Sequence, residues 1–240
     1  MKQLITAFVL FIGISANAQW PWEKIEGNGH LTRQTRSVGS FTEISSSGAW
    51  DVMIAYGESS SIQVEADENL LPYLETKVEG NKLMIRPSKK INLHSRNKIT
   101  VYVSMTRVAG ISLSGSGDVI GKGKFRNDGN TDFHVSGSGG IQLDFDRVSS
   151  ADVSISGSGN IRLNGSAHSI NARISGSGNA DCSDLITDDA SAHISGSGNI
   201  KLNANKSVDA SISGSGNVSY KGAAADVKKH VSGSGRLVKA

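Results

Sequence analysis

The sequence has one cysteine, three prolines and few aromatic residues among its 240 residues. The single thiol, Cys182, excludes a disulfide framework within the chain, so packing and backbone pairing must supply the stability. It also lies far from the N-terminus, where a bacterial lipid anchor would require a cysteine. The formal net charge is only +3 and both signs are spread evenly, which leaves no electrostatic footprint for nucleic acid.

Long apolar runs are also scarce, and the one notable run lies at residues 4–14. It is too short to span a bilayer as a permanent helix. Lys2 precedes it and Ala16-Asn17-Ala18 follows, an arrangement typical of a signal-peptide cleavage site. We therefore expect residues 1–18 to be a secretory signal peptide and the mature protein to have no transmembrane segment. The location should be periplasmic or at the cell surface.

Glycine, in contrast, is abundant and periodic. The tetrad Ser-Gly-Ser-Gly occurs seven times, and its copies begin at Ser114, Ser136, Ser156, Ser175, Ser195, Ser213 and Ser232. The mean step of about 20 residues indicates a solenoid of repeated turns. Aliphatic residues precede every tetrad and almost always occupy the second position after it, where one copy has Ala180.

Each copy alternates in a way that is typical of extended chain. Over residues 153–163, aliphatic residues and both glycines share one parity, while serines, Asn160 and Arg162 share the other. A repeat of about 20 residues is too short for a strand and a helix, and the glycine, serine and asparagine content also opposes helix. Residues 111–240 therefore predict a parallel β-helix, with glycines where its wall turns or has no room for a Cβ.

Residues 19–110 read as an N-terminal β-rich portion with ordinary alternating strands. The segment DENLLPYLE predicts a single helical turn around Pro72, and SSSGAWDV resembles a degenerate first copy of the tetrad. We place a soft boundary near residue 110, with a sheet that continues across it as the alternative.

Several different segments, in order, carry a resemblance to a known family. They are GNG at residues 27–29, VGSFTEI, WDVMI, VEADENLLPYLETKVEGNKLMI, the recurring ISGSGNI and the ending NVSYKGAAADVKKHVSGSGRL. Together, over roughly residues 25–240, they resemble the putative auto-transporter adhesin, head GIN domain family of bacterial envelope proteins. The resemblance implies an all-β fold, a right-handed single-stranded parallel β-helix at the cell envelope, and an adhesive role.

No segment matches a site for chemistry well. The glycine-rich segments lack the spacer of a phosphate-binding loop, and the tetrads lack the glycine that precedes a nucleophilic serine. His134 and His193 share a predicted column with His230 but lie two or three turns apart, which is too far for one metal ion. We expect no catalytic residue, no metal and no cofactor.

An acidic pair is the best enzymatic alternative, since the same fold hosts polysaccharide lyases and hydrolases. Asp144 and Asp146 fall two residues apart at a strand end. The residues aligned with Asp144, which are Asn164, Ser183 and Asn203, read as turn formers rather than as a site. A carbohydrate-active protein, either glycan-binding or polysaccharide-degrading, remains the alternative to a non-enzymatic module.

Two surfaces are candidates for binding a cell-surface glycan or an envelope protein. The first is a repetitive face of Ser156, Ser158, Asn160, Ser175, Ser177, Asn179, Ser195, Ser197, Asn199, Ser213, Ser215 and Asn217. The second is a basic loop with Arg86, Lys89, Lys90, Arg96 and Lys98, for which a solvated hairpin loop is the simpler interpretation.

The outward column also predicts a charge ladder of Arg162, Asp181 and Lys201 across three turns, worth roughly a few tenths of a kcal/mol per exposed pair. Cys182 occupies the slot of Leu163 and Leu202, so its thiol should be buried and inert. The leading hypothesis is a non-enzymatic, secreted or envelope-exposed β-helical adhesin.

Overall fold

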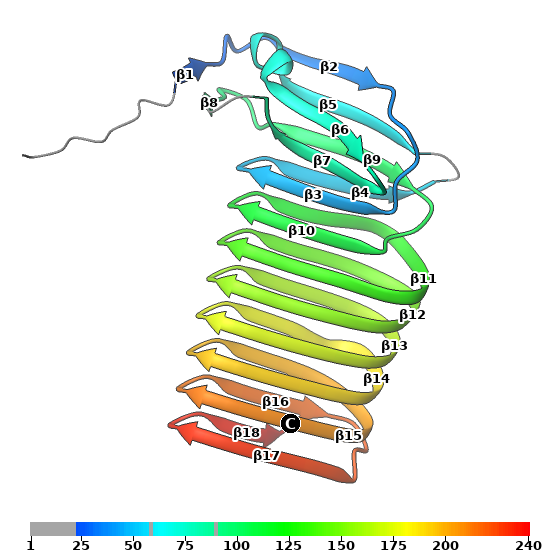
Figure 1. The fold of residues 1–240 in the computed structure, drawn as a ribbon, viewed down its shortest axis with the longest axis vertical. Helices are drawn as coiled ribbons and strands as arrows, with labels where there is room; N and C mark the ends of the chain where they lie inside the picture. Colours follow the sequence, from blue (N-terminus) through cyan, green and yellow to red (C-terminus); the bar gives the residue numbers. More distant parts are fainter. Residues whose placement is uncertain (1–22, 58–59, 89–90) are drawn as a thin grey trace, which may run out of the picture.

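The computed structural model describes residues 23–57, 60–88 and 91–240, so the expected signal peptide and Lys89 and Lys90 lie outside the described residues. The chain winds into an elongated, right-handed β-solenoid of about six turns (Figure 1). In each turn it passes along one wall, rounds a corner at the tetrad, and returns along a second wall to a wider bend. This confirms the predicted all-β, parallel β-helix.

The described residues up to Met105 form nine strands and one short helix. In chain order they are β1 (Glu23–Glu26), β2 (Leu31–Arg36), β3 (Glu43–Gly48), β4 (Asp51–Tyr56), β5 (Ser61–Asp67), the 3-10 helix η1 (Glu68–Tyr73), β6 (Leu74–Glu79), β7 (Lys82–Pro87), β8 (Ile91–His94) and β9 (Thr100–Met105). The helix contains Pro72, as the sequence predicts.

The remaining strands form the repetitive turns, and the long ones bend to serve both walls. They are β10 (Gly110–Gly115), β11 (Asp118–Gly137), β12 (Gly140–Gly157), β13 (Asn160–Gly176), β14 (Asn179–Gly196), β15 (Asn199–Gly214), β16 (Asn217–Lys221), β17 (Asp226–Gly233) and β18 (Arg236–Lys239). Each of them pairs in parallel with the turn before it, and all except β17 and β18 of the last turn also pair with the turn after.

The tetrad glycines stay in register from turn to turn. Successive corners are 22, 20, 19, 20, 18 and 19 residues apart, because a variable number of residues enters the opposite bend. Gly48 pairs with Gly115, and Val52 pairs with Val119, so β3 and β4 already form a turn of the solenoid. The segment SSSGAWDV is therefore a first copy of the tetrad, and the sheet runs across residue 110 without a break.

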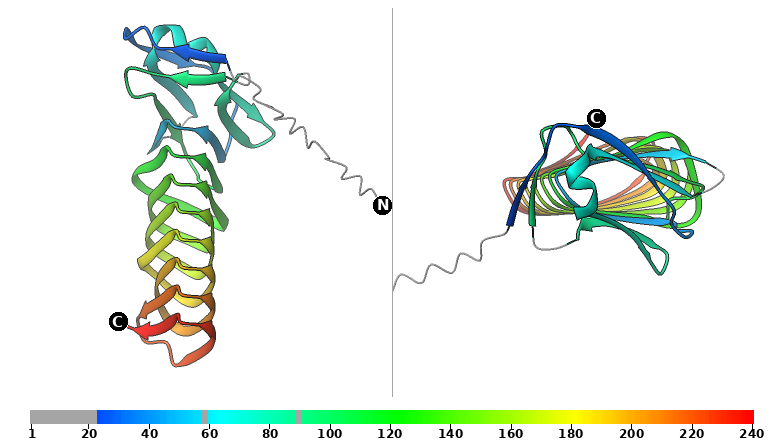
Figure 2. Two further views of the ribbon diagram at one scale, coloured as in Figure 1. Left: turned by 90° about the vertical axis from the view of Figure 1, so that its left-hand side faces the viewer. Right: turned by 90° about the horizontal axis from the view of Figure 1, so that it is seen from above.

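Antiparallel strands and the helix cover the N-terminal end of the rod (Figure 2). β2 pairs with β5, β5 pairs with β9, and β6 pairs with β7, all antiparallel. Leu70 and Leu71 of η1 are buried in the same hydrophobic core as the turns below. This end of the core is thus closed.

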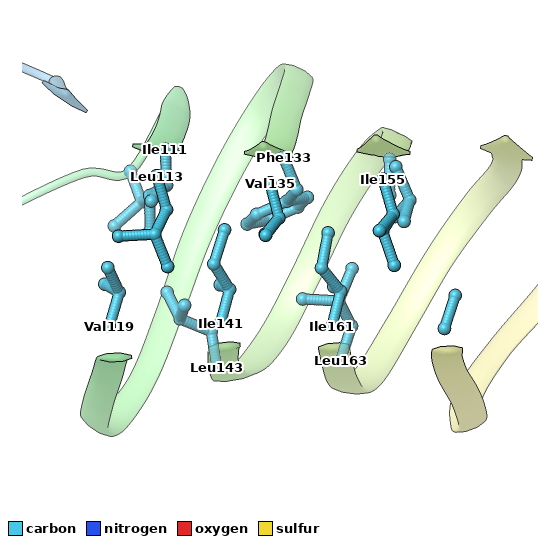
Figure 3. Close-up of a cluster of buried hydrophobic side chains, with 14 of the residues drawn as sticks. Ile111, Leu113, Val119, Phe133, Val135, Ile141, Leu143, Ile155, Ile161 and Leu163 are labelled. Carbon is cyan, nitrogen blue, oxygen red and sulfur yellow. The ribbon is translucent and has the colours of Figure 1, made fainter. Parts of the chain in front are cut away.

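The core is a continuous column of side chains between the two walls. Ile111, Leu113 and Ile155 come from one wall and meet Val119 and Ile161 from the other (Figure 3). This arrangement confirms the predicted parity of inward aliphatic residues.

The core side chains are larger near the N-terminal end than in the lower turns. Phe145 packs against Phe133 and Phe125 with ring centroids 5.8 and 6.3 Å away, whereas the lower turns place the buried residues Ala172 and Ala192 in register.

The two glycines of a tetrad have separate physical roles. Gly176 has φ of +126°, a conformation that L side chains rarely adopt, and so turns the chain at the corner. Gly178 has no such backbone requirement, but a Cβ on it would lie 2.5 Å from the Gly159 carbonyl oxygen and 2.6 Å from Cγ2 of Ile155. Both reasons given by the sequence therefore apply to Gly176, where a Cβ would also lie 2.5 Å from the Gly157 carbonyl oxygen, whereas the steric reason alone applies to Gly178.

The last turn presents charge where the others present apolar residues. Lys229 pairs with Ala210 on the inward parity and is exposed, and Lys239 lies with its ammonium 5.9 Å from the ring centroid of Tyr220. Inward-facing lysines of this kind oppose edge-to-edge pairing of sheets.

Candidate binding groove

An asparagine follows each of four consecutive tetrads, and these four side chains form a hydrogen-bonded ladder that we call the amide column. It consists of Asn160, Asn179, Asn199 and Asn217, which pair in register. The Nδ2 atoms of Asn179, Asn199 and Asn217 each donate to the Oδ1 of the asparagine one turn before, at 3.0, 3.0 and 3.2 Å. Each amide uses one N–H for this ladder, so the second N–H faces outward, together with the second lone pair of each oxygen.

Two residues along each strand, Arg162, Asp181 and Lys201 form the charged column. Asp181 Oδ2 lies 3.4 Å from Arg162 Nη2 and 3.6 Å from Lys201 Nζ, which confirms the predicted ladder. Partial burial raises the pKa of Asp181, but hydrogen bonds from Ser183 and the two cations outweigh it and hold the pKa below its ordinary value. The carboxylate is therefore charged and already paired on both sides.

A groove of about 580 Å³ lies between these two columns and follows the solenoid axis. It extends over six turns, from Asp118 to Asn217, or about 24 Å at the spacing of neighbouring strands. Its floor includes Ile141, Ala180 and Ile200, whose side chains point into the core. The wall thus combines a narrow apolar floor with repeated polar edges.

The tetrad serines lie beside this groove rather than in it. The first serines end one wall, in register from Ser156 to Ser213, and the second serines stand at the corner. All eight of these predicted serines are exposed: Ser156, Ser158, Ser175, Ser177, Ser195, Ser197, Ser213 and Ser215. The structure therefore brings the predicted asparagines into the groove lining and arranges the serines along the adjacent edge.

The predicted basic loop is divided by the fold. Arg86 lies in strand β7, where it forms ion pairs with Glu75 at 2.9 Å and Glu79 at 2.8 Å. Lys98 pairs with Asp51 at 2.5 Å, which raises the pKa of the lysine through the hydrogen bond and the opposite charge. Acidic partners distant in sequence, which the local pattern does not reveal, thus neutralise much of this stretch.

A buried carboxylate, Asp67, fixes the rest of that stretch and was not identified from the sequence. It is fully buried and accepts hydrogen bonds from the Arg96 backbone N–H at 2.7 Å, from Ser95 Oγ at 2.9 Å and from Asn97 Nδ2 at 2.5 Å. Burial raises the pKa of Asp67, but these hydrogen bonds outweigh it and the net shift is downward.

The same network reaches the Gly27-Asn28-Gly29 segment. Asn97 Nδ2 donates to the Gly29 carbonyl oxygen, and Asn69 Nδ2 donates to the Glu26 carbonyl oxygen. The aspartate at the start of DENLLPYLE was the available signal, although nothing local distinguishes it from a helix cap.

The acidic pair considered for catalysis is engaged in structural contacts. Asp144 accepts a hydrogen bond from Asn164 at 2.6 Å, and Asp146 lies 3.8 Å from Lys124. Two alignments were wrong. Asn164 pairs with Asp184 and not with Ser183, because the register shifts between Arg162 and Asn164, and Asn203 pairs with Ile186 after a second shift.

The structure places the three histidines in one column and buries the cysteine, as the sequence predicts. His134, His193 and His230 share one exposed column with intervening residues between them. Within residues 23–57, 60–88 and 91–240, no group of three or more His, Cys, Asp or Glu could hold a metal ion. Cys182 is buried, which raises the pKa of its thiol to about 12.

The sequence model described as putative auto-transporter adhesin, head GIN domain matches residues 40–224. The chain belongs to this family. The match covers the groove, the turns before it and, apart from β1 and β2, the strands that cover the N-terminal end, and so agrees with the resemblance found in the sequence. No curated protein matches the chain.

Solved structures share the fold of this adhesin family member over almost its whole length. A putative adhesin from Bacteroides fragilis is 23% identical, with a TM-score of 0.85 over 90% of this chain and all of the other. A putative lipid binding protein from Parabacteroides distasonis is 25% identical, with a TM-score of 0.72 over 91% and 100% of the two chains. A putative adhesin from Parabacteroides merdae is 24% identical, with a TM-score of 0.72 over 91% and 99%. In the described part of this chain, no helix has the length and apolar character needed to cross a bilayer.

Proposed function

We propose that this member of the adhesin family is a non-catalytic module of the cell envelope that attaches to a surface partner through the groove and the serine edge beside it. The observation that carries the proposal is the amide column, in which the same donor and acceptor recur over four consecutive turns. Such an array suits an extended partner that is contacted many times, and weak contacts then add along its length.

The experiment is retention of purified, labelled protein on whole bacterial cells and on isolated envelopes. The double variant Asn179→Ala with Asn199→Ala removes half of the amide column. Asn171→Ala is the matched control, because its amide also donates across turns, to Asp152 at 2.8 Å, but lies on the other wall. Loss of retention only in the double variant supports the proposal, and no retention of the wild-type protein contradicts it.

The non-catalytic part of the proposal draws support from the engagement of Asp144 and Asp146 with neighbouring side chains. Its test is product release from acidic polysaccharides, compared with Asp144→Asn and Asp146→Asn variants. Release by the wild-type protein that disappears in either variant would establish an enzyme instead.

The envelope location rests on family membership and on the predicted signal peptide, residues 1–18. Fractionation of cells, with protease treatment of intact cells, distinguishes the periplasm from the surface. Recovery of the protein in the cytoplasmic fraction, with its N-terminus uncleaved, would contradict the proposal.

A further inference from the structure

The groove on the solenoid wall has features that narrow the chemistry of its occupant. We infer that it binds a linear, uncharged polysaccharide that lies parallel to the solenoid axis. This inference rests on the proposed function, in which the groove is the attachment surface, and specifies the class of partner.

The donors and acceptors of the amide column that the ladder does not use are complementary to a chain of hydroxyl groups. Within the ladder, Asn179 donates to Asn160 and accepts from Asn199, which leaves one N–H and one lone pair on its amide. A hydroxyl group is both a donor and an acceptor, so one sugar hydroxyl can satisfy both. Along the groove, this complementary pair recurs at about 4.8 Å, the strand spacing, which is close to the repeat of pyranose units in an extended chain.

The charged column disfavours a polyanion. Arg162 and Lys201 both pair with Asp181, so the three side chains present one net positive charge and a central carboxylate. Asp118 adds a second carboxylate at the N-terminal end of the groove, where its Oδ1 accepts the Gly140 backbone N–H at 2.9 Å. With Arg162 and Lys201 balanced by Asp118 and Asp181, the groove lining has no net charge, so it offers no overall attraction to a densely anionic chain.

The floor of the groove supplies the remaining contact. Ile120, half-exposed, lines the groove beside Ile141, Ala180 and Ile200, whose side chains point into the core. Of these four side chains, only that of Ile120 is open to the C–H edges of sugar rings, and the buried residues contribute backbone to the floor. Since none of the lining residues is aromatic, each sugar is held weakly and affinity must come from contacts over several turns.

An extended peptide fits this groove less well. Peptide groups repeat at about 3.3 Å per residue, so they would drift out of step with the amide column within a few residues. Extended peptides also bind best by adding a strand to a sheet edge, and the edges of this sheet lie at the ends of the solenoid.

The test measures binding of β-1,4-linked cello-, xylo- and manno-oligosaccharides, from disaccharide to octasaccharide, by isothermal titration calorimetry. Oligogalacturonates and an extended poly-asparagine peptide serve as the competing classes. We expect at least one neutral series to bind, with affinity that rises with length and levels off once the oligomer spans about 24 Å. Asn179→Ala with Asn199→Ala should weaken the binding by at least about tenfold, and Asn171→Ala should leave it unchanged.

Three results would overturn the inference: no neutral oligomer binds, an acidic oligomer or the peptide binds more tightly, or the double variant binds as well as the control variant. Far-UV circular dichroism of both variants shows whether the fold is intact. If cells retain the protein through the groove while every neutral series fails, the polysaccharide assignment is wrong and the proposed function stands. If neither cells nor oligosaccharides bind, both are wrong.

Discussion

The close contact at the second glycine of each tetrad gives a quantitative prediction for Gly178→Ala. The new methyl group would lie 2.5 Å from the Gly159 carbonyl oxygen and 2.6 Å from Ile155 Cγ2, so backbone of the neighbouring turn must move. Overpacking of this kind costs about 1–3 kcal/mol. Replacing a flexible glycine lowers the conformational entropy of the unfolded chain, which stabilises the folded protein by about 0.4–1 kcal/mol. The net loss in free energy of unfolding should be about 1–2 kcal/mol.

For a chain of this size, that loss lowers the midpoint of thermal unfolding by about 3–6 °C. Gly198→Ala is a replicate, because its methyl group would lie 2.4 Å from the Gly178 carbonyl oxygen. Gly39→Ala is the control, since nothing lies within 4 Å of its Cβ position and it should be neutral or slightly stabilising. Unfolding is followed by far-UV circular dichroism. A Gly178→Ala variant as stable as Gly39→Ala would refute the steric account of the corner.

Three further predictions follow from the cap, the core and the last turn. The pKa of Asp67 is lowered in the folded state, so its contribution to stability is present above about pH 4 and is lost as pH falls through the folded pKa. The difference in free energy of unfolding between wild type and Asp67→Asn should therefore shrink below that pH in acid denaturation. An advantage that grows below pH 4 would contradict the sign. Cys182, buried and with a pKa of about 12, should react with thiol reagents only after denaturation, and rapid labelling of the native protein would show that its turn opens. Lys229→Val should increase self-association in light scattering, because it removes an inward charge from the last turn; an unchanged monomer would show that other groups protect this edge.

The repetitive part of the fold could be predicted from the sequence because each turn supplies an independent copy of the same evidence. The alternation of Ile155 and Ser156 gives the parity, and the step between tetrads gives the register. Together these correctly paired Arg162 with Asp181 and Asp181 with Lys201. Repetition also predicted the column of asparagines that lines the groove.

The parts that could not be predicted are those where the repeat fails. The bend opposite the tetrad takes a variable number of residues, so Asn164 moves out of alignment with Ser183 and pairs with Asp184. The cap depends on Asp67, which binds residues about 30 positions away through contacts that occur once. Arg86 likewise meets its partners across a hairpin. A single sequence carries no periodic signal for such contacts.

The register of the tetrad corners allows the length of the solenoid to change by whole turns. Gly176 and Gly196 occupy equivalent positions, and each corner contacts only the corners directly before and after it. Removing residues 177–196 would join Gly176 to Ser197 with the tetrad corners and the asparagine column still in register, but it would remove Asp181 and so place Arg162 beside Lys201. Duplicating these residues would extend the rod by about 4.8 Å. The length of the rod and the number of sites along the groove can therefore change together through gain or loss of one 20-residue unit while the two ends of the molecule stay the same.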